Sequence, residues 1–284
     1  MSNKKSFIAK MEEAILRLTK MDFMDSAEKV EELLKNPSQN GPPKGIFKSI
    51  DIDGTQVFTF GDENAKNTIL YIHGGAYVLE IGYQHLLYCF LLSRKLNAYV
   101  LAPVYPLAPS SKAMQTYEVI TDLYKKLILK DNLALMGDSA GGGFAHSFCQ
   151  YLKTVDLPQP DRIITFSPWV DVSMSNPPYD SENDPILGEI GLREIGKSWA
   201  GDLSTQDWRV SPLFGDNAGL PDTLIFAGEN EIFYQDIEKY VENLENDGVN
   251  VRLVTGSGLF HIYPLFPIPE AIGVFKEIKK EIIG

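Results

Sequence analysis

A Gly-Asp-Ser-Ala-Gly sequence at residues 137–141 constrains the fold of this chain more than any other feature. It directly follows the apolar run at residues 133–136 and directly precedes a stretch with a helical pattern. In such a strand–turn–helix context the glycines keep side-chain bulk away from a sharp turn, and the serine hydroxyl projects clear of the sheet. Free N–H groups at the helix N-terminus favour developing negative charge there. The pattern therefore predicts that Ser139 is a nucleophile that forms a covalent acyl intermediate.

The composition is that of an acidic globular protein. The chain has 284 residues, 44% of them apolar, a net charge of −12 and a pI of about 4.8. An acidic surface disfavours nucleic acid and anionic membrane as partners. No run approaches the ~20 apolar residues of a membrane span, and the first residues do not resemble a signal peptide. The two cysteines, Cys89 and Cys149, are expected to be buried free thiols, so we expect a cytoplasmic protein without stable membrane anchoring.

Two helices are predicted near the N-terminus. Apolar residues recur at helical spacing between charged residues over positions 7–18. A second helix is expected at about 25–35, where Asp25 and Glu28 resemble a capping box. A segment rich in proline and glycine follows. We therefore expect residues 1–45 to form an N-terminal helical lid.

The rest of the chain alternates short apolar runs with helix-like stretches. A hairpin is predicted around Asp53-Gly54. Further strands are expected at 68–72, 98–104, 133–136, 163–166, 223–227 and 251–254, and helices near 84–95, 114–130, 140–153, 234–246 and 269–283. This alternation indicates an α/β fold whose mostly parallel central sheet is covered by helices on both faces.

One interval breaks this alternation. Residues 171–220 are rich in proline, glycine, aspartate and aromatic residues and contain no clear strand. A long insertion after the carboxyl end of a strand is a typical place for a lid. We therefore expect residues 46–170 and 221–284 to form the core and residues 171–220 to form a lid insertion.

A nucleophilic serine needs a base, and the chain has four histidines. His146 lies in the helix that follows Ser139, His85 lies in an early helix and His73 precedes two glycines. His261 follows the last predicted strand, in a loop that emerges at the same sheet edge as the serine turn. The α/β-hydrolase order of serine, acid and histidine also requires a late histidine. His261 is therefore the predicted base.

The base needs an acid that fixes its tautomer and stabilises the imidazolium. In the loop after the predicted strand at 223–227, Glu229, Glu231 and Asp236 compete for this role. Strand alternation and loop length do not separate the two glutamates. Asp236 is expected inside the next helix, facing solvent or capping. Glu231 is the favoured acid, with the other two left open.

The anionic intermediate needs N–H donors. Gly74 and Gly75 follow the predicted strand at 68–72, and two successive glycines let the backbone approach a ligand closely. The N–H of Ala140 lies just past the serine. The expected oxyanion hole therefore consists of Gly74, Gly75 and Ala140.

Several motifs together resemble a known family. His-Gly-Gly at 73–75, Gly-Asp-Ser-Ala-Gly-Gly at 137–142 and Ser-Pro-Trp-Val-Asp at 167–171 occur in order, with looser matches at 105–109 and 211–213. From about residue 68 onward the chain is therefore similar to the hormone-sensitive-lipase-like esterases, a group of α/β-hydrolases. The resemblance implies a serine esterase with an α/β-hydrolase fold and a helical lid made of two pieces.

Carried over residue by residue, the resemblance implies Ser139 as nucleophile and His261 as base, with Gly74, Gly75 and Ala140 as the oxyanion hole. It strengthens Glu231, because the family often carries an Asp five positions after its acid, as Asp236 does here. The chain departs from the family pattern at Ala76, Pro106 and Ser110, where the family has a glycine, an arginine and an acidic residue. These departures concern the width of the pocket and a local hydrogen-bond network. Asp138 is expected to brace the turn.

The expected substrate is a small ester with a short or medium acyl chain and no charged head. We expect Phe23, Met24, Tyr77 and Trp199 to line its pocket, although such residues are more often plain core. Neither a metal nor an organic cofactor is expected. An amidase or peptidase, an acyltransferase, and a ligand-binding protein without activity remain as alternatives. The sequence leaves a homo-oligomer open.

Overall fold

The computed structural model describes residues 5–37 and 41–283 and contains an eight-stranded sheet. Its strands are β1 (Ser49–Ile52), β2 (Thr55–Phe60), β3 (Asn67–Ile72), β4 (Ala98–Pro103), β5 (Leu133–Asp138), β6 (Arg162–Phe166), β7 (Asp222–Gly228) and β8 (Val251–Gly256). Their order across the sheet is β1-β2-β4-β3-β5-β6-β7-β8. The β1–β2 and β2–β4 pairs are antiparallel, and all pairs from β4 to β8 are parallel. The predicted mostly parallel sheet is thus confirmed.

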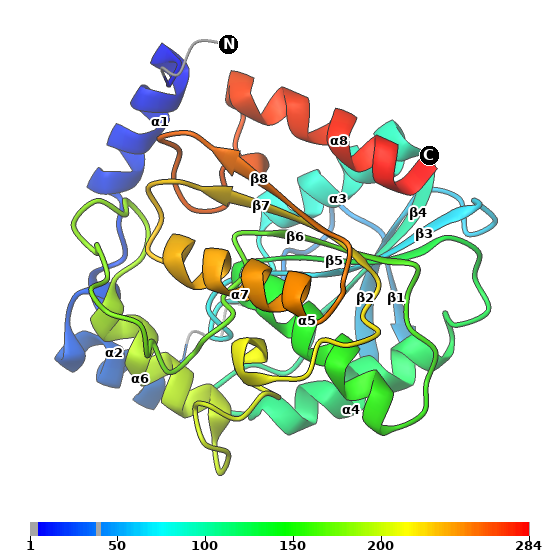
Figure 1. Cartoon of the computed structure of the whole chain (residues 1–284), viewed down its shortest axis with the longest axis horizontal. Helices are drawn as coiled ribbons and strands as arrows, with labels where there is room; N and C mark the ends of the chain where they lie inside the picture. Colours follow the sequence, from blue (N-terminus) through cyan, green and yellow to red (C-terminus); the bar gives the residue numbers. More distant parts are fainter. Residues whose placement is uncertain (1–4, 38–40, 284) are drawn as a thin grey trace.

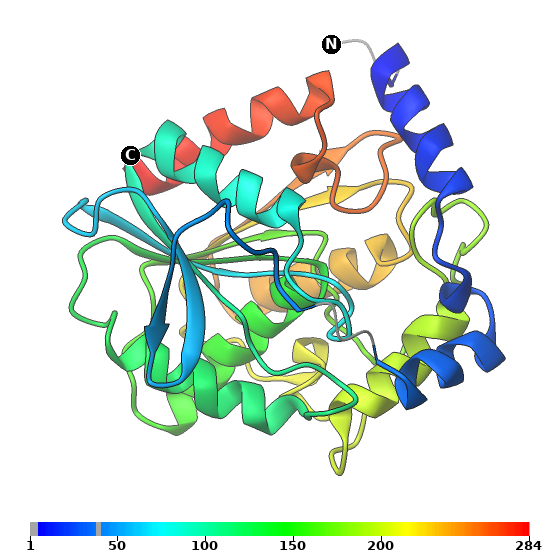
Figure 2. The same ribbon diagram turned by 180° about the vertical axis from the view of Figure 1, so that it is seen from behind.

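Helices cover both faces of this sheet (Figures 1 and 2). They are α1 (Phe7–Leu18), α2 (Ala27–Lys35), α3 (Tyr83–Leu96), α4 (Ala113–Lys125), α5 (Ser139–Thr154), α6 (Glu189–Ala200), α7 (Tyr234–Asn246) and α8 (Ile272–Ile283). Buried residues of α3 and α8 form one apolar cluster with one face of the sheet, and those of α4, α5 and α7 form a second cluster with the other face. Because both faces are covered, every residue of β3 and β5 is buried. This explains why those strands are continuous apolar runs rather than alternating ones.

The N-terminal segment and the insertion pack on each other. A short 3₁₀ helix (Asp22–Met24) and α2 both contact α6, and Figure 1 shows α1, α2 and α6 on the side toward which the β7 and β8 arrows point. The contact is close because Gly191 has no side chain. A Cβ at that position would lie 2.7 Å from the Cα of Met24. The two regions that the sequence separates by more than a hundred residues therefore lie together at the carboxyl end of the sheet.

Several predicted boundaries differ in detail. The side chain of Ser26, rather than Asp25, caps α2 by accepting from the amide of Lys29, since Asp25 lies at the end of the preceding 3₁₀ helix. The helix expected to reach residue 130 ends at Lys125 and continues as turns. The helix expected from residue 269 begins as a 3₁₀ turn (Pro269–Ala271) before α8.

Helix α1 turns its apolar stripe outward. Phe7 is 75% exposed and Leu18 is 87% exposed, while Arg17 reaches across to the insertion. The helix was predicted, but its outward-facing apolar stripe and its polar contacts to a segment far away in the sequence were not. Among the described residues, no helix is long and apolar enough to cross a membrane. Cys89 and Cys149 are buried free thiols, as expected.

Candidate active site

Ser139 lies in the sharp turn between β5 and α5. Its φ of +51° falls in the left-handed region, which is strained for any residue with a Cβ. The turn depends on a glycine before it, because a Cβ on Gly137 would lie 2.6 Å from the carbonyl carbon of Gly141. The carbonyl oxygen of Ser139 accepts a 2.9 Å hydrogen bond from the amide of Trp169. The turn therefore has the strained geometry of a nucleophile elbow.

His261 meets this serine from the loop after β8. Its Nε2 lies 2.9 Å from the Oγ of Ser139, and both side chains are almost completely buried. The ring of Phe233 stands edge-on against the imidazole, with centroids 5.3 Å apart at 81°. The next residue, Ile262, has φ +49° and donates its amide to the Oγ of Ser167 at 2.9 Å. The imidazole is therefore packed against an aromatic ring, and the loop is held by a hydrogen bond directly after the histidine.

Glu231 is the carboxylate that faces the other imidazole nitrogen. Its Oε1 lies 3.7 Å from the Nδ1 of His261, beyond hydrogen-bond length, and neither atom has a hydrogen-bond partner among the described residues. Its Oε2 accepts from the hydroxyl of Ser167 at 2.5 Å and from the amide of Gly228 at 2.9 Å. One oxygen is thus held by two donors, and the other is left facing the histidine.

Glu229 and Asp236, the other two candidate acids, have hydrogen-bond partners other than the imidazole. Glu229 accepts from the hydroxyl of Ser257 at 3.0 Å and from the amide of Gly258 at 2.8 Å, so it binds the loop that carries His261 rather than the imidazole. Asp236 lies on α7, as expected, but it neither faces solvent nor caps: it is fully buried and accepts from the hydroxyl of Tyr179 at 2.9 Å. Burial raises the pKa of Asp236 to about 6.

The amides after β3 differ in their hydrogen bonds. The N–H of Gly74, which was expected to serve the oxyanion, donates to the Oδ1 of Asp138 at 3.0 Å. Among the described residues, the next two amides, those of Gly75 and Ala76, have no hydrogen-bond acceptor. Gly75 has φ +104° and Ala76 has φ +50°. This left-handed pair redirects the backbone after β3. The N–H of Ala140 lies in the first turn of α5, where helix amides have no internal acceptor.

Asp138 links this turn to the serine elbow. Besides the Gly74 amide, its Oδ1 accepts from the hydroxyl of Tyr71 at 2.7 Å, and its Oδ2 lies 3.4 Å from the Nε2 of His85. Burial alone would raise the pKa of Asp138, but the nearby His85 and the hydrogen bond from Tyr71 outweigh burial and lower it. The Nδ1 of His85 accepts from the amide of Gly82 at 3.0 Å, which leaves Nε2 as its donor. Asp138 therefore braces the turn, as expected.

The remaining two histidines are buried and lie outside this arrangement. Burial lowers the pKa of His73 to about 3 and that of His146 to about 3. His146 contacts the hydroxyl of Thr165 at 3.1 Å. His73 stacks on Tyr105, whose hydroxyl donates to the carbonyl of His73 at 2.6 Å. Both are neutral core residues at ordinary pH.

The residues expected to line the pocket divide into two groups. The ring of Tyr77, which follows Ala76, stacks on Trp199 of α6 with centroids 4.0 Å apart at 3°. Met24 is buried against α6. Phe23 is only half-buried and lines an outward groove of about 410 Å³ with charged residues such as Asp22 and Lys29. Tyr77 and Trp199 are thus brought together, whereas Phe23 lies apart from them.

Sequence reasoning gave no role to Ser167. Its hydroxyl donates to Glu231 and accepts from the amide after His261, so it joins the acid to the loop that carries the base. Its φ is +48°, and its amide donates to the carbonyl of Phe226 at 2.6 Å. The available signal was the Ser-Pro-Trp-Val-Asp motif at the end of β6, which indicates the family resemblance but not the role of its serine.

Comparisons with known proteins agree with this architecture. The pattern that defines the α/β hydrolase fold family matches residues 69–265. An esterase of Acinetobacter venetianus is 29% identical over 217 residues, covering 73% of this chain and 72% of that protein. The crystal structure of a putative esterase from Staphylococcus aureus has a TM-score of 0.85 and 26% identity, covering 93% of this chain and 97% of the other.

A hormone-sensitive lipase from a metagenome library adds a further likeness in fold. Its crystal structure has a TM-score of 0.81 at 22% identity and covers 98% of both chains. The predicted family resemblance is confirmed by the family match together with the esterase relatives. The chain belongs to the α/β hydrolase fold family.

Proposed function

We propose that Ser139, His261 and Glu231 form the catalytic triad of a serine carboxylesterase. The observation that carries this proposal is the 2.9 Å contact between the Oγ of Ser139 and the Nε2 of His261, within a strained and buried elbow. Family membership gives the reaction class independently: the chain is a serine hydrolase that cleaves carboxylic esters. The roles of the individual residues rest on their geometry.

The reaction runs in two half-reactions. Ser139 attacks the ester carbonyl while the Nε2 of His261 takes the hydroxyl proton. The tetrahedral intermediate collapses, the C–O bond to the alcohol breaks, and the imidazolium returns the proton to the leaving oxygen. Water then attacks the acyl-serine with the same base, and the carboxylic acid leaves.

The negative oxygen of each tetrahedral intermediate needs donors that are not already committed. The amides of Gly75, Ala76 and Ala140 meet this requirement, and we assign them as the oxyanion hole in place of the set that included Gly74. Removing one such donor typically costs ~3–4 kcal/mol of transition-state stabilisation. The side chain of Ala76 does not impair the role, because an alanine keeps its N–H.

Glu231 acts through the histidine. Its Oε1 faces the Nδ1 of His261 and stabilises the positive charge that forms when Nε2 takes the serine proton. Apart from this contact, the carboxylate is fixed by Ser167 and Gly228, which leaves Oε1 as the oxygen directed at the imidazole. Neither Glu229 nor Asp236 has a contact of this kind.

The two segments at the carboxyl end of the sheet form the lid in our proposal. Residues 1–45, of which 5–37 and 41–45 are described, and residues 171–220 meet through α2 and α6. The stack of Tyr77 on Trp199 joins the backbone after β3 to this lid. We assign Tyr77, Trp199 and Met24 to the acyl side of the site, with Phe23 at its outer margin. Such an apolar lining suits a small ester with a short or medium acyl chain and no charged head.

Covalent labelling tests the nucleophile and the base. A fluorophosphonate probe should label the native protein and leave Ser139→Ala unlabelled, while His261→Ala should react far more slowly. Both variants should lose about 10⁴-fold or more in kcat while keeping the native melting temperature. Native-like turnover in either variant would remove that residue from the mechanism, and an unreactive native protein would favour a ligand-binding protein.

Product analysis tests the reaction class. Hydrolysis of p-nitrophenyl butyrate should exceed that of the matched anilide by several orders of magnitude. An anilide rate equal to the ester rate would indicate an amidase. With methanol added at modest concentration, free butyrate should remain the main product. Predominance of methyl butyrate would indicate an acyltransferase instead.

A further inference from the structure

A buried carboxylate outside the triad touches the loop that carries Glu231. We call residues 228–233 the acid loop and residues 180–184, within the insertion, the bridging loop. Asp184 of the bridging loop is 1% exposed. Its Oδ2 accepts the amide of Ile232 at 2.9 Å, and Ile232 directly follows Glu231. Its Oδ1 accepts from the amides of Ile186 and Leu187 at 2.8 and 2.9 Å.

The acid loop is bound on its other side by the loop of His261. The amide of Asn230 donates to the carbonyl of Leu259 at 2.9 Å, and its side chain donates to the carbonyl of Gly258 at 3.2 Å. These contacts fix the acid loop next to the histidine, but they lie before Glu231 in the chain. Asp184 supplies the fixed point directly after it. Glu231 therefore lies between two anchors, one in the core and one in the insertion.

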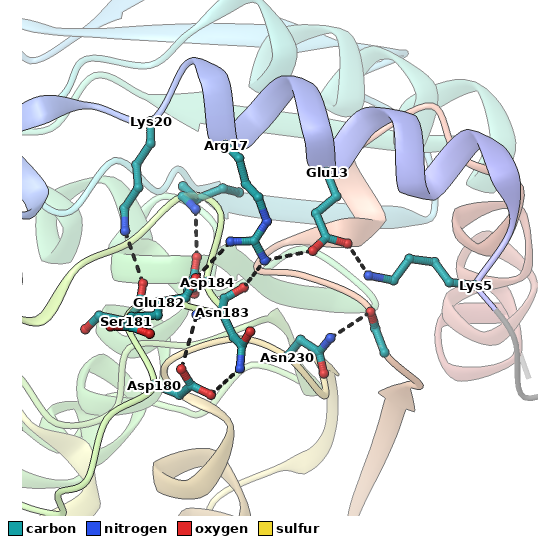
Figure 3. A network of polar contacts seen from close by, with 12 residues as sticks. Lys5, Glu13, Arg17, Lys20, Asp180, Ser181, Glu182, Asn183, Asp184 and Asn230 are labelled. Carbon is teal, nitrogen blue, oxygen red and sulfur yellow. Dashed lines mark hydrogen bonds and ion pairs between the residues drawn. The ribbon is translucent and has the colours of Figure 1, made fainter.

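The bridging loop is in turn fastened to the N-terminal segment (Figure 3). Arg17 of α1 donates to the carbonyl of Glu182 at 2.8 Å and to that of Asn183 at 2.7 Å. Lys20 donates to the carbonyl of Ser181 at 3.2 Å. A guanidinium that holds two adjacent carbonyls fixes the backbone orientation as well as its position. The bridging loop thus connects the N-terminal segment to the acid loop, with hydrogen bonds from Arg17 and Lys20 on one side and the hydrogen bond between Asp184 and Ile232 on the other.

We propose that Asp184 is a positioning residue for Glu231, and that Arg17 and Lys20 hold the bridging loop so that Asp184 can act. The inference rests on the proposed role of Glu231 as the triad acid. A carboxylate at position 184 has two acceptor oxygens, and it needs both: one closes its own turn, and the other holds Ile232. An amide has one acceptor oxygen only. An asparagine there leaves either the turn or the acid loop without its acceptor.

The test begins with Asp184→Asn and a matched control, Asp171→Asn. Asp171 is also buried within the insertion and accepts the backbone amides of Ser173 and Ser175 at 2.8 Å each, but it has no hydrogen bond to the acid loop. On p-nitrophenyl butyrate, Asp184→Asn should lower kcat by about 10- to 100-fold, since displacements near 1 Å cost up to ~10²-fold. KM should stay within about threefold, and Asp171→Asn should keep its kcat. Equal kcat values in the two variants would overturn the proposal.

A double-mutant cycle shows whether Asp184 acts through Glu231. Glu231→Gln alone should be strongly impaired, and adding Asp184→Asn to it should lower kcat by less than about twofold further, because the positioned group is already gone. Losses that multiply in full would mean that Asp184 acts elsewhere, which refutes the inference and leaves the triad intact. If Glu231→Gln keeps native kcat, the acid assignment itself fails, and the positioning role fails with it.

A third variant decides the question if Asp184→Asn does not fold. Arg17→Gln/Lys20→Gln changes one exposed and one partly buried side chain and should keep the native melting temperature within a few degrees. Its kcat should fall by about 2- to 10-fold, the size of coupling carried by such contact chains. Lys130→Gln is the matched control, because Lys130 also holds a backbone carbonyl, that of Glu63, at the amino ends of β3 and β5. A native kcat in Arg17→Gln/Lys20→Gln as well as in Lys130→Gln would refute the proposed link between the N-terminal segment and Glu231.

Discussion

Asp236 provides a quantitative test of the packing behind the acid loop. Burial, with a smaller contribution from the neighbouring Asp171 carboxylate, raises the pKa of Asp236 from an ordinary 3.8 to about 6, although the Tyr179 hydrogen bond opposes this. The folded protein therefore binds this proton more tightly than the unfolded chain does. Between about pH 4 and pH 6 the folded state carries more protons, so raising the pH through this range lowers the free energy of unfolding.

The size of the effect follows from the two pKa values. A pKa of about 6 against 3.8 corresponds to about 3 kcal/mol of destabilisation at pH 7.5, at about 1.4 kcal/mol for each factor of ten. Asp236→Asn has nearly the same shape and keeps an acceptor oxygen for the hydroxyl of Tyr179. The hydrogen bond to a neutral acceptor is weaker by roughly 1 kcal/mol. The variant should therefore be more stable than the native protein by about 1–3 kcal/mol at pH 7.5, and about equal to it below pH 4.

Urea unfolding at pH 4, 5, 6 and 7.5, followed by tryptophan fluorescence, measures this difference. Glu242→Gln is the control, since Glu242 is exposed on the same helix, and its effect should stay within about 0.5 kcal/mol throughout. The reasoning is refuted if Asp236→Asn is less stable than the native protein at pH 7.5. It is equally refuted if the difference between them does not grow from pH 4 to pH 7.5.

Three further outcomes are expected at the site. Ser167→Ala removes one of the two donors to the Oε2 of Glu231 and leaves the N–H after His261 without its acceptor, which should cost about 1–3 kcal/mol in urea unfolding and about tenfold in kcat. Smaller losses in both the free energy of unfolding and kcat would mean that this hydroxyl does not join the two loops. Glu231→Gln should lower kcat by about 10²- to 10⁴-fold, and Glu229→Gln should lower it by about twofold at most. A larger loss of kcat in Glu229→Gln than in Glu231→Gln would exclude Glu231 as the acid. In a crystal structure of the fluorophosphonate adduct of Ser139, the distance between the Nδ1 of His261 and the Oε1 of Glu231 should shorten from 3.7 Å to about 2.8 Å; an unchanged gap would contradict charge stabilisation by Glu231.

The sheet and the position of Ser139 in a turn between a strand and a helix could be predicted because their signals are local. Each parallel strand is a short apolar run bounded by turn residues, and each crossover helix has its own period. The elbow is equally local, since two glycines four residues apart permit the left-handed serine between them. The late position of His261 followed from chain order, which the topology of a parallel sheet converts into a place at one edge.

Features that depend on contacts between distant segments were not predictable in this way. The amide of Gly74 was expected to be free for an oxyanion, but Asp138, on another strand, accepts a hydrogen bond from it. Asp236 was expected to face solvent or to cap, because nothing in α7 reveals that Tyr179 of the insertion folds over it. Helix α1 has a clear apolar stripe, yet that stripe faces outward, while Arg17 of the same helix finds its acceptors in the bridging loop. In each case the deciding partner lies far away in the sequence.

The gap of 3.7 Å between Glu231 and His261 follows from how the carboxylate is held. Two donors fix Oε2, and they come from Ser167 and Gly228 rather than from the imidazole. If Oε1 were also held by other donors, its negative charge would already be satisfied before the reaction. Left without a hydrogen bond in a buried site, it gains most when the imidazole becomes charged, which is the moment at which stabilisation lowers the barrier. The orientation of Glu231 therefore has to come from its backbone neighbours, and for this reason the anchors on either side of it matter to the chemistry.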